Sequence, residues 1–267
     1  QGNVREGTTL LEESLAIYRT LGDKIGQADT LKFLTVVNKG HPEYLADLIK
    51  EAIRLYRELG DLSGITLCLM ELARLTMWKG DFSSPAPMLE EAITISRQLG
   101  SQSSEVEALI THGTLAYWRG DYEGAMAFYE EAIGISEKTG DRFQNLWGRV
   151  HKAYVVLRQG YIQKACALFK DNITNQAGLT ITLVYNIEGL ASLYVHEHQF
   201  ARAVRLFAWT NAMREKLGDP RPPVEQASVE RDLAFIRSKV DEGEFENFSA
   251  KGRTMTVEQA IDFALQG

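Results

Sequence analysis

The sequence has few cysteines and prolines, no excess of basic residues and no long hydrophobic run. Only Cys68 and Cys166 among its 267 residues are cysteines, so neither a disulfide framework nor a cysteine-based metal cluster can be built. Lysine and arginine number 29 against 36 aspartates and glutamates, which disfavours a nucleic-acid-binding surface. No apolar run is long enough to span a bilayer, and no signal peptide is recognisable. We therefore expect a soluble, cytoplasmic chain that contacts neither membrane nor nucleic acid directly.

Catalytic motifs are missing as well. The chain contains no Gly-x4-Gly-Lys-Ser/Thr phosphate-binding loop and no Gly-x-Ser-x-Gly nucleophile turn. His196 and His198 flank Glu197, but residues two apart on a helix point about 200° away from each other and do not easily share one metal ion. No base, nucleophile or metal set converges in the sequence. We expect no enzyme activity, no metal and no cofactor.

A phrase repeated along the chain is the strongest positive feature. Residues 120–141 read "GDYEGAMAFYEEAIGISEKTGD", and related phrases occupy 2–23, 40–61 and 80–101. Two interleaved glycine series mark the repeat, spaced 38 or 40 residues apart: Gly2, Gly40, Gly80, Gly120 and Gly160 open the phrase, and Gly22, Gly60, Gly100, Gly140 and Gly178 close it. Two glycine series indicate two helices per unit, each ending at a residue free to adopt positive φ.

Each expected helix has only one strongly apolar face, so a unit can bury that face only against its neighbours. Stacked units would then form an all-helical solenoid with a concave surface. Asp81 and Asp121 follow an opening glycine and suit the N-cap position. Pro85 and Pro87 are tolerated only in a first turn, which predicts that this copy of the helix begins at Ser83 or Ser84.

The unit "LITHGTLAYWRGDYEGAMAFYEEA", residues 109–132, resembles a tetratricopeptide repeat. The signature of that family is matched by a small residue in the first helix, Gly-Asp-Tyr at the turn and the Ala-x3-Tyr-x2-Ala pattern of the second: Gly113, Gly120, Asp121, Tyr122, Ala125, Tyr129 and Ala132. A second good match comprises Leu190, Ala191, Tyr194, Phe200, Ala203 and Phe207. The resemblance spans roughly residues 2 to 217 and implies a right-handed α-α superhelical solenoid of about five helix pairs. Its period of about 40 residues exceeds the usual ~34.

Both ends of the chain carry information. The first copy starts at the second helix of a unit, so we expect a fragment of a longer protein, with repeats in 1–218 and a helical cap in 219–267. Residues 224–240 should form an amphipathic helix whose Leu233, Phe235 and Ile236 cover the last pair. Two short helices follow, with Thr256 and Gln259 placed for a capping box.

The C-terminal segment resembles the end of large bacterial signal-transduction ATPases of the STAND type, some of which regulate transcription. Their Gly-Arg-x-Met-(Ser/Thr)-x-Glu-x-Ala pattern is matched by Gly252, Arg253, Met255, Thr256, Glu258 and Ala260. This resemblance implies a sensor module that is joined, in the full protein, to a nucleotide-switch domain and an effector.

A ligand of a tetratricopeptide array sits on the first helices, which line the concave groove. Transferring that pattern unit by unit predicts a groove lined by Arg74, Trp78, Thr114, Tyr117, Trp118, Trp147, His151, Tyr154, Arg158, Tyr185 and Glu188. Aromatic faces supply contact area, and arginine reads a carboxylate or phosphate, which suits a peptide, a protein segment or a small inducer.

Structural roles are open for the same residues. Each tryptophan can equally fill the gap between long helices, and either arginine can pair with an acid such as Glu71. Two functions from different classes therefore compete: a sensor with one deep groove of mixed aromatic and charged residues, and a passive scaffold with an open, mostly charged concave face. The mixture of aromatic and charged residues predicted for the groove favours the sensor.

Overall fold

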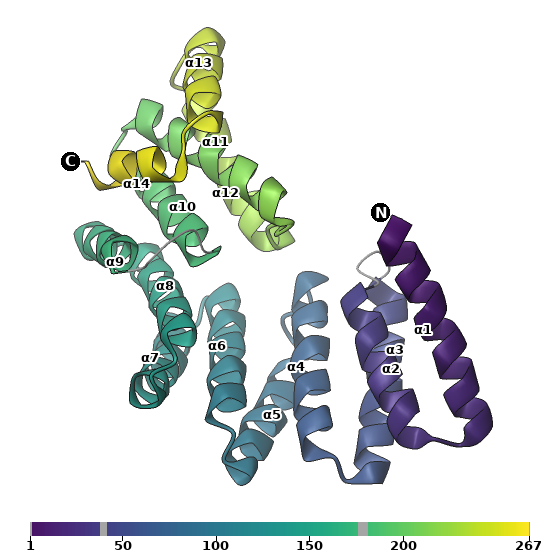
Figure 1. Cartoon of the computed structure of the whole chain (residues 1–267). Helices are drawn as coiled ribbons and strands as arrows, with labels where there is room; N and C mark the ends of the chain where they lie inside the picture. The colour runs from purple at the N-terminus through teal and green to yellow at the C-terminus, as the bar shows by residue number, and fades with distance from the viewer. Residues whose placement is uncertain (1, 38–41, 176–180, 267) are drawn as a thin grey trace. The chain divides into compact units, whose positions relative to one another are not determined.

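The computed structural model describes residues 2–37, 42–175 and 181–266, and these form fourteen helices with no strand among them (Figure 1). None of the described helices has the length and apolar character needed to cross a membrane. In chain order the helices are α1 (Gly2–Leu21), α2 (Lys24–Val37), α3 (Pro42–Leu59), α4 (Leu62–Trp78), α5 (Ala86–Leu99), α6 (Gln102–Arg119), α7 (Tyr122–Thr139), α8 (Arg142–Arg158), α9 (Ile162–Thr174), α10 (Ile181–His196), α11 (Phe200–Leu217), α12 (Pro223–Arg237), α13 (Glu242–Arg253) and α14 (Val257–Leu265).

The helices follow one another in pairs, as the two glycine series predict. We call the first helix of each pair helix A (α2, α4, α6, α8 and α10) and the second helix B (α3, α5, α7, α9 and α11); α1 has the sequence of a helix B. Glycines between helices have φ between 65° and 85°, a conformation that other residues rarely adopt: Gly22, Gly60, Gly80, Gly100, Gly120, Gly140, Gly160 and Gly218. Gly40 and Gly178 lie outside the described residues. The all-helical array of paired helices is confirmed.

Aspartates start several of these helices. The side chains of Asp61, Asp121 and Asp141 each accept a hydrogen bond from the backbone N–H three residues later. Asp81 does not cap a helix in this way. Its carboxylate binds Ser83 and Ser84, and α5 begins only at Ala86 with Pro85 before it. The predicted start at Ser83 or Ser84 is therefore two to three residues early, because these serines are held in a turn by Asp81.

The chain divides into two compact units, Gln1–Arg119 and Gly120–Gly267, here called unit 1 and unit 2. Within each unit, consecutive helices pack on each other, and helix A packs on the next helix A: α4 on α6 in unit 1 and α8 on α10 in unit 2. Columns of fully buried alanines let neighbouring helices approach closely: Ala52, Ala92 and Ala132, and Ala125, Ala165 and Ala203. The separation of residues 219–267 as a domain of their own stays a prediction.

The end of unit 2 is covered mainly by α13, which packs against α11. Phe245 of α13 is buried, and a Cβ atom added to Gly252 would lie 2.2 Å from the carbonyl oxygen of Arg205 in α11. α14 adds the buried Ala260 and Ala264, and its expected capping box between Thr256 and Gln259 is present.

α12 also packs on the last pair, α10 and α11, as predicted, but not all of its three expected covering residues are buried. Ile236 is buried as predicted and Leu233 is half-buried, but Phe235 is 41% exposed and contacts Phe200 edge-on. The sequence pattern of α12 and of α13 is amphipathic in both cases. α13 makes the closer contact because Gly252 has no side chain and its backbone can approach the backbone of α11.

Replacing Gly252 with alanine should destabilise unit 2, because the new methyl group has no room against the α11 backbone. Overpacking of this kind costs about 1–3 kcal/mol. The matched control is Gly134→Ala in α7, where nothing lies within 4 Å of the added Cβ and the helix should gain about 0.5–1 kcal/mol. Urea unfolding of both variants measures the difference. A Gly252→Ala protein as stable as Gly134→Ala would contradict the close contact.

Candidate functional site

Helix-A residues of unit 2 bring several predicted site residues together. The ring of Trp147 in α8 meets the ring of Tyr185 in α10 edge-on, with the centroids 5.0 Å apart. His151 packs at 5.0 Å from Trp147 and stacks at 5.3 Å on Tyr129. Trp147 stays half-buried, and the exposed Phe143 stacks beside it at 6.3 Å. The aromatic side chains are thus exposed to solvent at the start of α8, at Phe143, and buried two turns later, at His151.

The deeper members of this set are packed inside the unit. Burial lowers the pKa of His151 to about 4, so its imidazole is neutral at physiological pH. The hydroxyl of Tyr154 donates to the backbone carbonyl of Tyr185 at 2.8 Å, and the Tyr154 ring packs edge-on against Phe169. Burial also raises the pKa of Tyr185 above its usual value. His151, Tyr154 and Tyr185 therefore support the aromatic surface from beneath and contribute little to its exposed part.

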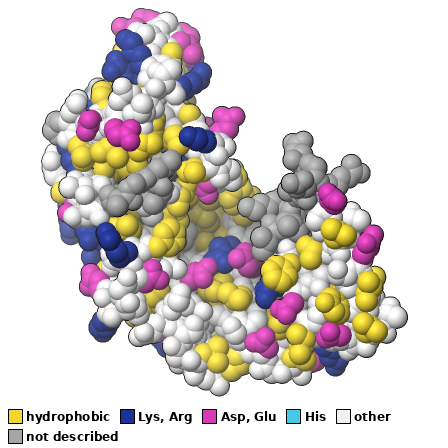
Figure 2. All heavy atoms as spheres, in the orientation of Figure 1, with side chains coloured by type: hydrophobic (Ala, Val, Ile, Leu, Met, Phe, Trp, Pro, Cys, Tyr) yellow, Lys and Arg dark blue, Asp and Glu magenta, His cyan; other side chains and the backbone are white. Residues whose placement is uncertain are grey.

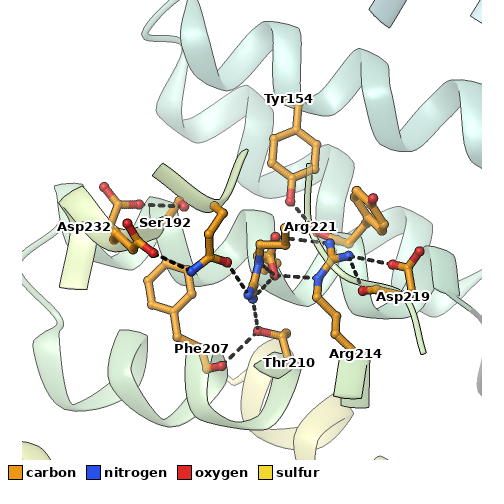
Figure 3. A network of polar contacts seen from close by, with 12 residues as sticks. Tyr154, Ser192, Phe207, Thr210, Arg214, Asp219, Arg221 and Asp232 are labelled. Carbon is orange, nitrogen blue, oxygen red and sulfur yellow. Dashed lines mark hydrogen bonds and ion pairs between the residues drawn. The ribbon is translucent and has the colours of Figure 1, made fainter. Parts of the chain in front are cut away.

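Glu188 is the buried centre of a polar network in unit 2. It lies in α10 with 5% of its side chain exposed, and arginines from two other segments converge on its carboxylate (Figure 3). Arg214 of α11 donates two hydrogen bonds to it, at 3.1 and 3.2 Å. Arg221, in the segment between α11 and α12, donates from Nε at 2.8 Å. A buried carboxylate is costly without such partners, so Glu188 fixes both arginines in place.

The two arginines extend the network in different directions. Arg214 also donates to the Asp219 carboxylate at 2.6 Å and lies over the Tyr185 ring at 4.1 Å. Burial alone would lower the pKa of Arg214, but Glu188 and Tyr185 raise it above its ordinary value. Arg221 reaches Thr210 of α11 and Gln226 of α12. The segment 219–226 is thereby bound to both α10 and α11.

Further contacts join α12 to the helix-A side chains. Arg158, at the end of α8, donates to the hydroxyl of Ser228. Ser192 of α10 donates to Asp232 at 2.8 Å (Figure 3). Together with the Arg221–Glu188 pair, these contacts lay α12 along the helix-A surface of α8 and α10. That surface is the one that the repeat pattern predicts for a ligand.

Two acids of α12 face this network. Burial and the Glu188 charge raise the pKa of Glu225 from 4.5 to about 7, although Arg214 and Arg221 act in the opposite direction. Burial also raises the pKa of Asp232, while the hydrogen bond from Ser192 and the charges of Arg158, His196 and Arg231 lower it. The seated α12 is therefore more favourable when these acids are protonated.

In unit 1 the predicted arginine is paired. Arg74 of α4 donates to Glu71 of the same helix at 2.6 Å and to Glu107 of α6 at 2.9 Å. Burial alone would lower the pKa of Arg74, but these two carboxylates raise it. About a third of the Arg74 side chain remains exposed, at 35%. Arg74 thus joins neighbouring A helices while its edge stays accessible.

The tryptophans of unit 1 differ although they occupy equivalent repeat positions. Trp118 packs against Phe82 with the ring centroids 5.6 Å apart, beside a core that includes Met77. Trp78 is 38% exposed. Thr114 donates to a carbonyl of its own helix, and Tyr117 is half-buried. Of the predicted residues in unit 1, Trp78 and Arg74 are the most available to a ligand.

Sequence reasoning missed the residues that contact this face from outside the repeats. The sequence pattern assigns these residues to the helical cap and not to the groove: Arg221, Ser228 and Asp232. One clue was present: a glutamate in the otherwise apolar α10 requires a basic partner, and Arg221 stands in the short segment after the last repeat. The predicted site as a whole stays a prediction.

The described residues contain no group of three or more histidine, cysteine, aspartate or glutamate side chains arranged to hold a metal ion. Figure 2 shows acidic and basic side chains interspersed over the visible face, with apolar side chains in separate patches. No broad area of one charge sign stands out on that face.

Comparisons with known proteins agree with this architecture. A family model described as a tetratricopeptide repeat matches residues 113–139. The crystal structure of BtubC (BKLC) from P. vanneervenii is similar with a TM-score of 0.63 and 16% identity, covering 82% of this chain and 94% of that one. The crystal structure of a single-residue variant of a putative kinesin light chain with nearly identical TPR-like repeats, from Podosopora anserina, gives a TM-score of 0.50 and 16% identity, covering 82% and 97%. A search of curated proteins finds no significant match. Residues 113–139 therefore match one tetratricopeptide repeat, and the described residues have the fold of a tetratricopeptide-like solenoid of paired helices.

Replacing Glu188 with glutamine should strongly destabilise unit 2, because Arg214 and Arg221 would lose their shared carboxylate in a buried place. Breaking such a pair costs about 3–5 kcal/mol. The matched control is Glu71→Gln, which removes an Arg74 partner whose side chain is 52% exposed and should cost less than about 1 kcal/mol. Denaturant unfolding compares the two. Equal losses in both variants would refute the structural weight of Glu188.

The raised pKa of Glu225 predicts a pH dependence. A folded-state pKa of about 7 against 4.5 means that stabilisation present below pH 4.5 is lost as pH rises through 7. Glu225→Gln stays neutral, so its melting temperature should rise relative to the natural protein between pH 5 and 8. The control Ala227→Ser, an uncharged change at an exposed position of the same helix, should show a constant difference. A flat profile for Glu225→Gln would contradict the raised pKa of this half-buried carboxyl group.

Proposed function

We propose that the chain is a non-catalytic interaction module whose helix-A surfaces bind a peptide or protein segment. Tetratricopeptide arrays generally serve protein–protein interaction, and repeat stacks present extended binding surfaces of this kind. The observation that carries the proposal is the set of accessible aromatic and arginine side chains on the A helices. Trp78 and Arg74 provide it in unit 1, and Phe143, Trp147 and Arg158 provide it in unit 2.

The chemistry of these side chains favours a segment with both apolar and acidic groups. Aromatic rings supply most of the binding energy at protein interfaces, and arginine is the basic residue most enriched at such hot spots. Arg74 is already shared by two carboxylates, so an acidic ligand group would compete with Glu71 or Glu107 for the exposed edge of its guanidinium. A bound segment would therefore gain more from apolar contact with Trp78 than from charge.

A sensor role within a longer signalling protein is the finer part of the proposal. It is supported by the C-terminal pattern from Gly252 to Ala260, which resembles the end of bacterial signal-transduction ATPases. Three of these residues have structural roles within the cap: Gly252 approaches α11, Thr256 caps α14 and Ala260 is buried. Arg253 and Glu258 are exposed and are available to other parts of such a protein. A passive scaffold is the competing function.

The first test is a screen of the full chain against an array of synthetic twelve-residue peptides, followed by hydrogen–deuterium exchange with each peptide that binds. Bound peptides should slow exchange in A helices such as α4 and α8, and leave B helices such as α5 and α9 unchanged. Protection confined to the B helices would refute the proposed surface. A sensor further requires that binding changes exchange in helices outside the footprint, whereas a scaffold shows protection at the footprint only.

Trp78→Ala should weaken the binding of an array-selected peptide that protects α4 by about tenfold or more, since an interface aromatic typically contributes over 1.4 kcal/mol. The matched control is Tyr44→Ala on helix B of the same unit, where the side chain is 40% exposed against 38% for Trp78. Fluorescence anisotropy measures both affinities, and melting temperatures should change little in either variant. Equal affinity of the two variants would remove Trp78 from the surface.

A further inference from the structure

The helix-A surface of unit 2 already holds a helix, and that helix belongs to the same chain. Arg158 and Ser192 bind Ser228 and Asp232, which lie one turn apart on α12. Arg221, just before α12, enters the buried carboxylate site of Glu188. Residues of α8 and α10 therefore bind three groups along the segment 221–232: first the Arg221 guanidinium, then the Ser228 hydroxyl and then the Asp232 carboxylate.

α12 is seated loosely compared with the other terminal helices. Only Val229 and Ile236 are buried among its fifteen residues. A pocket of about 460 Å³ lies between α11, α12 and α13, with Phe207, Leu233 and Arg237 among its walls. Few buried apolar contacts and an adjoining pocket are typical of segments that open at low free-energy cost.

The neighbouring α13 and α14 are held much more firmly. Gly252 brings α13 onto the α11 backbone, and the carbonyls at the end of α14 accept hydrogen bonds from Tyr194 and Arg202. Both helices pack directly on α11, and the last turn of α12 also contacts α13 because Arg237 lies over the Phe245 ring at 3.8 Å. Movement of α12 would therefore not uncover the apolar side of α11 that α13 covers.

The carboxylate site also tolerates the loss of one arginine. Glu188 keeps both hydrogen bonds from Arg214 when Arg221 leaves, so no lone buried charge results. The raised pKa of Glu225 also favours release of α12, because the ionised form of Glu225 is disfavoured beside Glu188 while α12 is seated. Removing one partner of a buried pair is costly in general, but here the second partner remains.

We propose that α12 together with Arg221 is an internal occupant of the helix-A surface of unit 2, and that the partner of this surface is an amphipathic helix that displaces it. The inference rests on the proposed function and names the partner class. Such a helix is preceded by an arginine that binds Glu188 and carries, about seven and eleven residues after that arginine, hydroxyl or carboxylate groups that bind Arg158 and Ser192. The module is closed until a competing helix arrives.

The tethered helix competes with any partner at high effective concentration, of order millimolar for a short linker. The observed affinity of a partner is reduced by the fraction of chains in which the surface is open. Variants that release α12 should therefore bind a competing helix more tightly, although they have lost contacts in the free protein. A purely structural α12 predicts no such gain.

The experiment uses a fluorescent synthetic peptide with the sequence of residues 219–240 and the full chain, with binding followed by anisotropy. The double variant Ser228→Ala/Asp232→Ala removes two contacts of α12 and should bind this peptide at least tenfold more tightly than the natural chain. The matched control, Ala227→Ser/Ala234→Ser, changes two exposed residues of the same helix and should bind as the natural chain does. Val229→Glu provides a second way to release α12 if the double variant leaves it seated, as exchange of the α12 amides would show.

The peptide itself supplies the specificity control, so that no folding defect intervenes. A peptide carrying Arg221→Ala should bind the released chain at least tenfold more weakly than the natural peptide. Equal affinity of released and natural chains, or undiminished binding of the Arg221→Ala peptide, would overturn the inference. If array peptides protect the A helices while the 219–240 peptide binds no variant, only this inference falls; if neither binds, the proposed function falls with it.

Discussion

The helices of the array have apolar surfaces that none of them can bury alone, and the architecture follows from this constraint. Paired helices bury these surfaces against the preceding and following helices, and fully buried alanines such as Ala92 and Ala165 set how closely they approach. The last helix of such a series lacks a successor. In this chain α13 takes that place on α11, and its Gly252 allows an approach that any side chain would prevent. Hydrophobic burial thus dictates the terminal cap as much as the repeats.

Much of this fold could be predicted from the sequence because helix ends leave local signals. A glycine at positive φ and an aspartate N-cap act within one turn, so Gly140 and Asp141 mark a helix boundary without any knowledge of the rest of the chain. The predicted start of α5 is misplaced because an aspartate can either cap a helix or stabilise a turn. The Asp81 carboxylate accepts hydrogen bonds from Ser83 and Ser84 in a turn before the helix. The capping box of α14 needs only Thr256 and Gln259.

The site was harder to predict because its residues depend on contacts between distant segments. Trp78 and Trp118 occupy the same repeat position, and the sequence alone does not separate them; Phe82 packs on Trp118 and leaves Trp78 exposed. The repeat column places Glu188 in the groove, whereas two arginines outside the A helices enclose it. The pattern predicts a helix face for the site, and only the packed chain shows which residues contact that face.

The close contact between α13 and α11 also has a consequence for how such an array changes in evolution. α13 covers the surface of α11 on which a following helix A would pack, and Gly252 makes that arrangement intolerant of any added side chain. A duplicated repeat inserted after α11 would have to displace α13 and build a new terminus at once. A duplicated repeat inserted earlier would meet only the regular surfaces of its neighbours. Lineages that carry this terminus should therefore differ in repeat number upstream of α10, while the segment from α10 to α14 is inherited as one block.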